Sequence, residues 1–409
     1  MLSCYRTSEA GHQRPPFPKK NITANVAYFW SKIAPSALEG HVLPTRIISR
    51  IMPVAVLGVS LTLTACSPSE PPAAAKTPAS VSVSVASAAV PASSSAPTAN
   101  QITVYTSIDK TALAPLLTVY AEKNAIPIHI VQDEPMSILA RLKAEGANSP
   151  ADIILTEDTG VFNTAAEAGL LQPFNTEKAL ANVPQRYRDP DGNWIALSSY
   201  ARTAVYDSRV LHANDISSYA DLAKTKWSQK LCMSQGRYIP NQSLVVNLIN
   251  NLGDKKTQEV MQGWMANLTM PVVLDDTEVL KAIENGKCQL GLVSSHHYAS
   301  YLQAHPQTPI QLTFINKGYG GVHTNITGAA IPHAAKHPEL ALGLIEWLAS
   351  KDQQTLYASL SKTYPIDKNT EATVLLKSWG DLEASPIAVS EYGEKQKLAI
   401  ELMKEAAYF

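Results

Sequence analysis

The chain has 409 residues, which is long enough for two domains with substantial cores. Its 34 basic and 35 acidic residues almost cancel, and this balance argues against nucleic acid or another polyanion as a partner. The positions of the four cysteines are more informative than their number, because Cys4 and Cys66 lie before the globular part and Cys232 and Cys288 lie within it.

The first informative segment is an export signal. A mostly apolar run, Ile51 to Leu63, follows Arg46 and Arg50, which is the pattern of a secretory signal peptide. The run is shorter than the roughly 20 apolar residues that span a bilayer. It ends in Leu63-Thr64-Ala65-Cys66, which resembles the bacterial lipobox, where the cysteine is lipidated and becomes the mature N-terminus. We predict a protein anchored through Cys66 to a bacterial membrane, in the periplasm or at the cell surface. An ordinary signal peptide with a chance cysteine is the alternative.

Two segments without a fold pattern flank this signal. Residues 1 to about 42 show no signal-peptide pattern, and we interpret them as an extension upstream of a true start near Val42 or Leu43. Residues from Pro68 to about Asn100 are rich in Ala, Ser, Pro and Val and carry almost no charge, so they cannot build a core. The predicted organisation is an extension and lipoprotein signal peptide over 1–66, a disordered linker over 67–100, and a globular part from 101.

Strands and helices alternate at the start of the globular part. The patterns predict strands at 102–105, 126–131 and 152–155, and helices at 111–123, 136–145 and 161–168. This β-α-β-α-β-α order argues for a largely parallel sheet covered by helices on both faces.

A second α/β region follows two adjacent predicted strands, Trp194 to Leu197 and Ala204 to Tyr206. We predict an α/β fold of two lobes, joined by two extended crossings near Ala201 and Gly318. Lobe 1 would comprise 101–200 with about 318–367, and lobe 2 would comprise 201–317 with the C-terminal helices 368–409. The further predicted elements are helices at 219–223, 244–251, 256–266, 278–284 and 338–350, and strands near Val272 and at 290–293, 310–315 and 326–331.

The candidate ligand-binding residues centre on His296 and His297. They follow the predicted strand at 290–293 and precede a predicted helix at 299–304. Open α/β sheets bind ligands at the carboxyl ends of their strands, so two imidazoles here can ligate a metal. The alternative is that both are surface loop residues. Export also bears on Cys232 and Cys288, since an oxidising compartment favours a disulfide between them over two buried thiols.

A set of short runs occurs along the globular part in a fixed order. These runs are Ile102-Thr103-Val104-Tyr105; Leu142-Lys143-Ala144-Glu145-Gly146-Ala147-Asn148-Ser149-Pro150-Ala151-Asp152; Glu157 with Ala168-Gly169-Leu170-Leu171; Trp194-Ile195-Ala196-Leu197-Ser198; Arg202 with Val205-Tyr206-Asp207; Asn241-Gln242-Ser243-Leu244; Asn325-Ile326-Thr327-Gly328-Ala329; and Tyr364-Pro365. Together they resemble the periplasmic ferric-ion-binding proteins, the solute-binding components of ABC-type iron importers, over about residues 101 to 370.

The resemblance implies a two-lobed periplasmic-binding-protein fold of type II and an ABC permease as partner. It implies iron or another transition metal as the transported ligand, with a synergistic anion bound beside it. Family members often carry cysteines at positions like Cys232 and Cys288, which agrees with a disulfide.

The resemblance also implies a metal site at Glu157, His296, His297 and Asp109. Family members hold ferric ion with a tyrosine pair where this chain has the two histidines. Some use a glutamate that matches Glu157, and many use a histidine or tyrosine in the first loop, where this chain has Asp109. Another branch adds a tyrosine at the position of Pro240.

The changed ligands alter the expected metal. Phenolate is a hard, anionic donor that suits Fe³⁺, whereas neutral imidazole suits Fe²⁺, Zn²⁺, Ni²⁺, Cu²⁺ or Mn²⁺. Two histidines with one or two carboxylates therefore make a reasonable cage for a divalent transition metal and a poorer one for bare ferric ion.

A second group of residues is predicted to bind an anion or other ligand. Arg202 either forms a structural salt bridge or holds a carboxylate or phosphonate bidentately. The loop 234–237 precedes a helix, whose amides could cradle an anion, and the matching family loop contacts a co-bound anion. For Asp276, capping of a helix is the alternative. The predicted residues are Arg202, Ser234, Gly236, Arg237, Asp276 and Ser294.

Four other polar residues fall outside these two groups. His323 is interpreted either as a structural histidine on a crossing strand or as a ligand contact. Tyr298 is interpreted as a core residue or a support for the ligands, and Asp158 and His41 as solvated residues.

The predicted function is a solute-binding lipoprotein of an ABC importer that captures iron or another transition metal. A small organic anion such as a phosphonate is the alternative cargo. A metal-dependent hydrolase is disfavoured, because the sequence has no HExxH or GxSxG motif. A protein that has lost solute binding and only interacts with partners is a third class.

Overall fold

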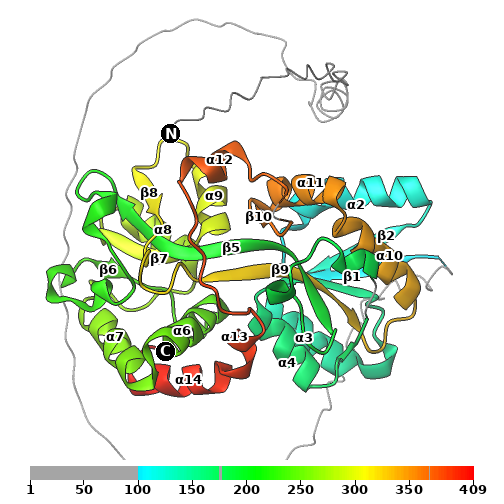
Figure 1. Ribbon diagram of the computed structural model, residues 1–409, viewed down its shortest axis with the longest axis horizontal. Helices are drawn as coiled ribbons and strands as arrows, with labels where there is room; N and C mark the ends of the chain where they lie inside the picture. Colours follow the sequence, from blue (N-terminus) through cyan, green and yellow to red (C-terminus); the bar gives the residue numbers. More distant parts are fainter. Residues whose placement is uncertain (1–99, 175–176, 368) are drawn as a thin grey trace, which may run out of the picture. The chain divides into compact units, whose positions relative to one another are not determined.

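The computed structural model describes residues 100–174, 177–367 and 369–409. The predicted signal peptide, Cys66, His41 and the linker lie outside these residues. In the described part, the main path of the sheet has the order β2-β1-β3-β9-β5-β7-β6. Strands β8 and β10 pair with β5, and β4 (Leu171–Gln172) pairs with β9. Helices pack against this sheet (Figure 1). No helix among the described residues is both long and apolar enough to cross a bilayer.

The first 65 or so residues of the globular part fold as predicted. The strands are β1 (Ile102–Thr106), β2 (Ile128–Gln132) and β3 (Ile153–Glu157), and they pair in parallel. The helices are α2 (Lys110–Asn124), α3 (Pro135–Glu145) and α4 (Thr159–Glu167). The burial of Leu113, Leu116, Leu117 and Tyr120 in α2 confirms the helical spacing of apolar residues.

The prediction of a largely parallel sheet is wrong beyond β3. Strand β9 (Thr324–Pro332) lies between β3 and β5 and runs antiparallel to both. Because β9 comes from far along the chain, its direction is not fixed by the local β-α-β pattern. The sheet is therefore mixed.

The two predicted strands around residue 200 are in fact one. Strand β5 (Trp194–Asp207) has 14 residues, all buried. The polar residues between the predicted strands broke the apolar pattern but find partners in the sheet, since Ser198 Oγ lies 2.6 Å from Thr327 Oγ1 and Thr203 Oγ1 donates to Thr313 O.

Strand β5 changes partners half-way along its length. It pairs with β9 through Ala201, and from Arg202 onward with β7 (Leu290–Ser294). From Ala204 to Asp207 it also pairs with β8 (Ile310–Thr313). This change falls at the predicted crossing near Ala201, whereas β9 begins six residues after Gly318. The residue boundaries of the two lobes stay a prediction.

The second α/β region contains longer helices than its apolar runs indicated. They are α6 (Ile239–Leu252), α7 (Asp254–Ala266), α8 (Asp276–Glu284) and α9 (Ser295–Ala304). The helix predicted at 219–223 is only a 3₁₀ turn at Asp221–Ala223, and the strand predicted near Val272 is a single bridge between Val273 and Ser234.

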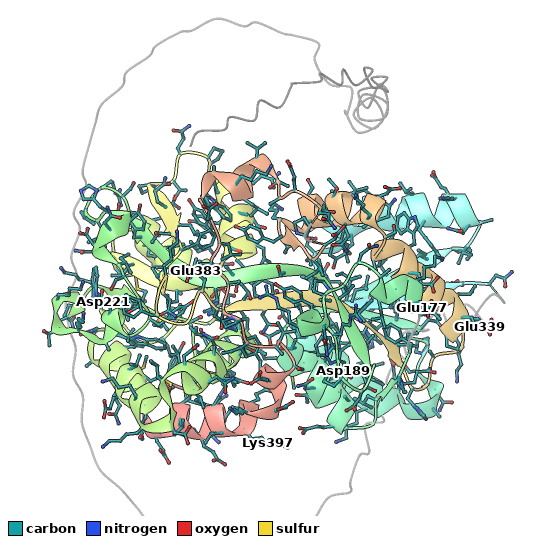
Figure 2. All side chains as sticks on the ribbon, viewed as in Figure 1. Glu177, Asp189, Asp221, Glu339, Glu383 and Lys397 are labelled. Carbon is teal, nitrogen blue, oxygen red and sulfur yellow. A yellow bond between two sulfur atoms is a disulfide. The ribbon has the colours of Figure 1, made fainter. Side chains whose placement is uncertain are left out.

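The C-terminal part returns to both halves of the sheet. It comprises α10 (Pro338–Leu348), α11 (Lys351–Ser361), β10 (Tyr364–Pro365), α12 (Val374–Ser378), α13 (Glu391–Glu394) and α14 (Gln396–Glu405). Helix α14 packs on α6 and α7, and α13 packs on α4 and α6 (Figure 1). Lys397 of α14, labelled in Figure 2, forms an exposed ion pair with Glu167 of α4. Burial of Leu402 and Met403 dominates the attachment of α14, because exposed ion pairs are weak.

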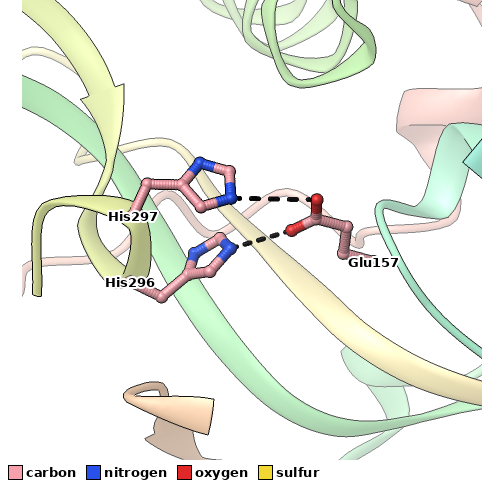
Figure 3. A group of neighbouring side chains, drawn as sticks. All are labelled: Glu157, His296 and His297. Atoms are coloured by element: carbon pink, nitrogen blue, oxygen red, sulfur yellow. Dashed lines mark hydrogen bonds and ion pairs between the residues drawn. The ribbon is translucent and has the colours of Figure 1, made fainter. Parts of the chain in front are cut away.

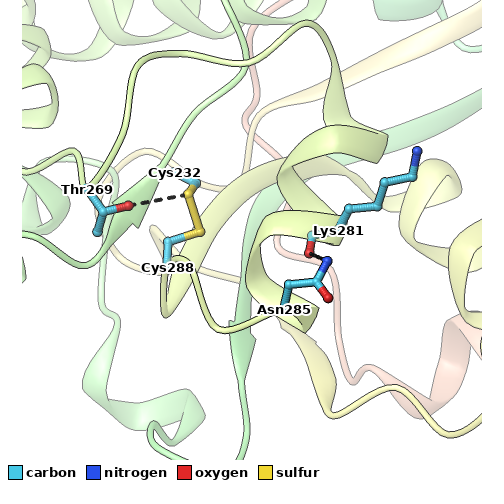
Figure 4. Close-up of a disulfide and its surroundings, with 5 residues drawn as sticks. All are labelled: Cys232, Thr269, Lys281, Asn285 and Cys288. Atoms are coloured by element: carbon cyan, nitrogen blue, oxygen red, sulfur yellow. Dashed lines mark hydrogen bonds between the residues drawn. A yellow bond between two sulfur atoms is a disulfide. The ribbon is translucent and has the colours of Figure 1, made fainter. Parts of the chain in front are cut away.

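The predicted disulfide is present. Cys232 ends β6 (Leu231–Cys232), and Cys288 lies two residues before β7, with which β6 pairs. Their Cα atoms are 5.9 Å apart, and the bond closes a loop of 56 residues (Figure 4). Both cysteines are buried in one hydrophobic cluster with Val279 and Ile283, which places the bond in the core of this half.

Replacing both Cys232 and Cys288 by serine should lower the free energy of unfolding by about 2–4 kcal/mol, because the unfolded chain regains the freedom of a long loop. Urea denaturation followed by circular dichroism measures the change. Reduction of the wild-type protein should give the same loss. An unchanged denaturation midpoint in both experiments would contradict a stabilising bond.

Candidate metal centre

Three predicted ligands meet in the structure. Glu157 is the last residue of β3, and His296 and His297 lie in the first turn of α9, directly after β7. One ligand atom from each of the three lies within 4.8 Å of the others. His296 Nε2 is 2.8 Å from Glu157 Oε2, and His297 Nε2 is 4.0 Å from Glu157 Oε1 (Figure 3). Both imidazoles therefore direct a ring nitrogen at one carboxylate.

The helical start explains how neighbouring histidines reach one point. Consecutive side chains on a helix project about 100° apart. The first turn of α9 places the two rings side by side, with centroids 4.1 Å apart. Their side chains are only 12% and 29% exposed, and that of Glu157 is 16% exposed, so the three are partly withdrawn from water without being sealed off.

A carboxylate behind His297 fixes its orientation. His297 Nδ1 lies 3.1 Å from Asp276 Oδ2, and the same oxygen accepts from the Ser294 backbone N–H at 2.8 Å. The Nδ1–H tautomer satisfies this contact and leaves the Nε2 lone pair turned toward Glu157. Carboxylates that hold a metal-binding histidine in this way are common behind metal sites.

The three ligands perturb one another's pKa values. Burial would raise the pKa of Glu157, but the His296 hydrogen bond and the charge of both imidazoles bring it below its usual range. Burial lowers the pKa of His296, and the neighbouring His297 lowers it further. Burial also acts to lower the pKa of His297, yet the Asp276 hydrogen bond and the Glu157 charge raise it overall. The pair thus combines one histidine with a lowered pKa and one with a raised pKa.

Of the two roles predicted for Arg202, a salt bridge within the protein and the binding of an anion, the structure contains the salt bridge. Its guanidinium is fully buried, lies 2.9 Å from Asp276 Oδ2, and also donates to Asn241, Ser234 and Ser294. None of Arg202, Ser234 and Ser294 lines the cavities beside the cluster. These three residues form a network behind the site, and the structure does not turn the guanidinium toward a cargo anion.

The remaining predicted residues lie at the edges of the site. Asp109 caps α2, accepting from Thr111 N and Oγ1 at 2.8 Å each, and it is outside the three-residue group. It lines a cavity of about 210 Å³ together with Glu157 and both histidines. A larger cavity of about 480 Å³ also adjoins Glu157 and His297, and Arg237 lines it. Gly236 packs against the backbone of Tyr408, with no room there for a side chain.

A family model for bacterial extracellular solute-binding proteins matches residues 116–384. The chain belongs to this family. Among curated relatives, it is 29% identical to iron uptake protein A2 of a Synechocystis species, over 69% of this chain and 84% of that protein. It is 23% identical to the major ferric iron-binding protein of Neisseria meningitidis serogroup B, over 76% of this chain and 94% of that protein.

Solved structures agree with this assignment. A Trichodesmium protein in complex with iron and citrate ligands superposes with a TM-score of 0.71 at 28% identity, covering 76% of this chain and all of that one. The ferric iron-binding protein A of Mannheimia haemolytica in an open conformation gives a TM-score of 0.70 at 28% identity, covering 76% and 99% of the two chains. The solute-binding protein therefore has the predicted two-lobed type II fold.

The prediction that Asp158 is solvated is wrong for this solute-binding protein. Asp158 is buried and accepts from Ser243 Oγ at 2.6 Å, Gly160 N at 2.9 Å and Tyr200 Oη at 3.3 Å. Burial raises its pKa to about 6, although the hydrogen bonds from Ser243 and Gly160 counter the shift. The Asp158-Thr159-Gly160 start of α4 is a capping signal that could have indicated this role.

Two tyrosines border the histidines. The ring of Tyr200 lies 4.5 Å from that of His296, and Tyr238 Oη lies 3.1 Å from His297 Nδ1. Burial raises the pKa of each phenol well above its usual value, and nearby carboxylates add to the shift. Tyr200 gave no signal in the sequence because it lies in the polar segment between the two predicted strands.

Tyr298 and His323 belong to the core of the solute-binding protein. Tyr298 Oη donates to Ile310 O, which confirms its core assignment. His323 is fully buried 4.7 Å from the ring of Tyr392, and neither ring nitrogen has a hydrogen-bond partner among the described residues. It does not join the three-residue metal group.

Asp276→Asn should weaken metal binding about 10- to 100-fold, because His297 loses the charged acceptor that orients it. Titration calorimetry with Zn²⁺ measures the change. The variant also leaves Arg202 without its counter-charge, so binding must be measured at a temperature where circular dichroism shows the folded state.

Asp275→Asn is the matched control for this substitution. Asp275 caps the same helix by accepting from Glu278 N, and asparagine also caps well. Equal metal affinity in the Asp275 and Asp276 variants would contradict the proposed orientation of His297.

Proposed function

We propose that this protein is the solute-binding component of an ABC importer and captures iron, or another transition-metal ion, between its two lobes. The observation that carries the proposal is the convergence of Glu157, His296 and His297 on one point. Nitrogen and oxygen donors at this spacing suit a transition metal. The similarity to iron-uptake and ferric iron-binding proteins supports the same cargo.

The position of the ligands supports a closing motion. Glu157 ends a strand that pairs with β1, whereas the histidines begin a helix after β7, which pairs with the far half of β5. An ion bound by both sides would favour the closed arrangement, and the chain near Ala201 and Gly318 would act as hinges. The closed form would then deliver the ion to a membrane permease.

The proposed location and the absence of catalysis follow from the same reasoning. The lipobox-like segment before Cys66 supports a lipid anchor, which would keep the binding protein near its permease. The protein would not be an enzyme, because its relatives bind and deliver solutes. A synergistic anion remains part of the proposal, supported by the citrate in the Trichodesmium structure and by Arg237 at the cavity wall. An organic anion as the sole cargo has less support, since the Arg202 guanidinium is already paired.

Replacing both His296 and His297 by alanine should abolish metal binding, because two of the three clustered donors are removed. In the wild-type protein, a metal at 100 times its Kd should raise the free energy of unfolding by about 2.7 kcal/mol. In the double variant, the same metal concentration should leave the free energy of unfolding unchanged. Thermal melts with and without Fe²⁺ or Zn²⁺, combined with elemental analysis, measure both effects.

His129→Ala is the control, since His129 lies exposed on β2 and outside the cluster. Its metal-induced stabilisation should equal that of the wild type. Unchanged metal affinity in the His296 and His297 double variant would remove the proposed site.

Cys66→Ser in the full chain should move the protein from the membrane fraction to the soluble fraction of a bacterial host, because the cysteine could no longer be lipidated. Detergent phase partitioning followed by immunoblotting measures the distribution. Cys4→Ser serves as the control and should leave the protein in the membrane fraction. A Cys66→Ser protein that still fractionates with the membrane would contradict the anchor.

A further inference from the structure

We infer that the cluster of Glu157, His296 and His297 selects a divalent transition-metal ion, so that the iron carried by this protein is ferrous rather than ferric. The inference rests on the proposed function and specifies the charge of its cargo. It starts from the number of anionic donors that the site can present.

The cluster offers one negative charge. Among its three members only Glu157 is anionic, and the two imidazoles donate as neutral groups. A divalent ion in this set keeps one net positive charge, and a trivalent ion keeps two. In a partly buried site the additional uncompensated charge is costly. The donor set therefore favours the lower charge.

The neighbouring carboxylates do not add to this count. Asp276 is paired with Arg202 at 2.9 Å, so its charge is already compensated, and it meets His297 through Nδ1 rather than through the nitrogen that faces Glu157. Asp158 accepts from Ser243 and Gly160. Asp109 is engaged in capping α2. Each of these acids has partners away from the point where the three ligands meet.

The two phenols beside the site do not face the ion position either. Tyr200 donates its hydroxyl to Asp158, and it meets His296 through its ring. Tyr238 directs its hydroxyl at Nδ1 of His297, whereas the ligand nitrogen is Nε2. Phenolate is the donor that would best stabilise ferric ion, and here the hydroxyls of Tyr200 and Tyr238 contact Asp158 and Nδ1 of His297 instead of the nitrogens that face Glu157.

The test loads the metal-free protein in two ways and measures the iron retained after desalting. One sample receives ferrous ammonium sulfate with ascorbate under argon, and the other receives ferric citrate in air. The wild type should retain about one ferrous ion per protein. From ferric citrate it should retain at least about tenfold less iron. Its absorbance spectrum after ferric loading should lack a tyrosinate-to-iron charge-transfer band.

The variant that replaces both His296 and His297 by tyrosine should reverse this preference and gain the charge-transfer band, because two phenolates then face Glu157. Circular dichroism establishes that the variant is folded. Tyr238→Phe in the wild-type background checks the nearest phenol and should leave the ferrous preference unchanged.

The outcomes separate this inference from the proposed function. Wild-type protein that retains ferric ion more firmly than ferrous ion overturns the inference but leaves metal capture intact. A charge-transfer band in the wild type that Tyr238→Phe removes also overturns it, because Tyr238 would then be a ligand. Retention of neither ion, together with no stabilisation by Zn²⁺ in the thermal melts, overturns both.

Discussion

The Arg202–Asp276 ion pair fixes the position of the candidate ligands. Both side chains are at most 1% exposed, and removing two charges from water costs several kcal/mol per ion unless the remaining hydrogen-bonding groups are satisfied. Here they are satisfied, because the guanidinium also donates to acceptors on three other segments. These acceptors are Ser234, Asn241 of α6, and Leu292 and Ser294 of β7. The pair thus joins β5 to α6, α8 and β7.

One atom connects this hydrogen-bond network to the candidate metal centre. Asp276 Oδ2 accepts from Arg202, from the Ser294 backbone and from His297. The orientation of the His297 ring is therefore set by a carboxylate that cannot move without breaking the buried pair. A rigid support of this kind behind a ligand is what holds a metal site in its geometry.

Strand β5 makes such a buried network compatible with a continuous sheet. Its central residues are polar, yet Ser198 bonds Thr327 on β9, and Thr363 donates to the same serine. Four residues farther along, Arg202 enters the ion pair. Judged by apolar alternation alone, the polar centre of β5 predicts a break between two separate strands. Tertiary partners satisfy its polar groups and let it run from one half of the sheet to the other.

The sequence predicted those features that local patterns or matching motifs encode. The apolar spacing of α2 located that helix to within one residue at each end, because one face of a helix is buried whatever packs on it. Glu157 and the histidine pair are 139 residues apart in sequence, and only the resemblance to a family connected them. Export, rather than spacing, indicated the disulfide between Cys232 and Cys288.

What the sequence could not predict depends on distant partners. The burial of Asp158 depends on Ser243, 85 residues away, and the place of Tyr200 beside His296 depends on the pairing of β5 with β7. The antiparallel insertion of β9 between β3 and β5 has the same origin. None of these contacts leaves a periodic trace in the chain, since each is specified only when the sheet forms.

The hydrogen bond between His296 and Glu157 suggests how the site works without an ion. At 2.8 Å, the shared proton joins the same nitrogen and the same carboxylate that an ion would join. A proton is thus a substitute for the metal, and an entering ion must displace it, because imidazole ligates only through a free lone pair. The metal-free protein can therefore hold the two sides of the cleft together at modest strength, and an ion replaces a single hydrogen bond by bonds to three ligands. The difference between these two states is the free energy by which the cargo favours closure.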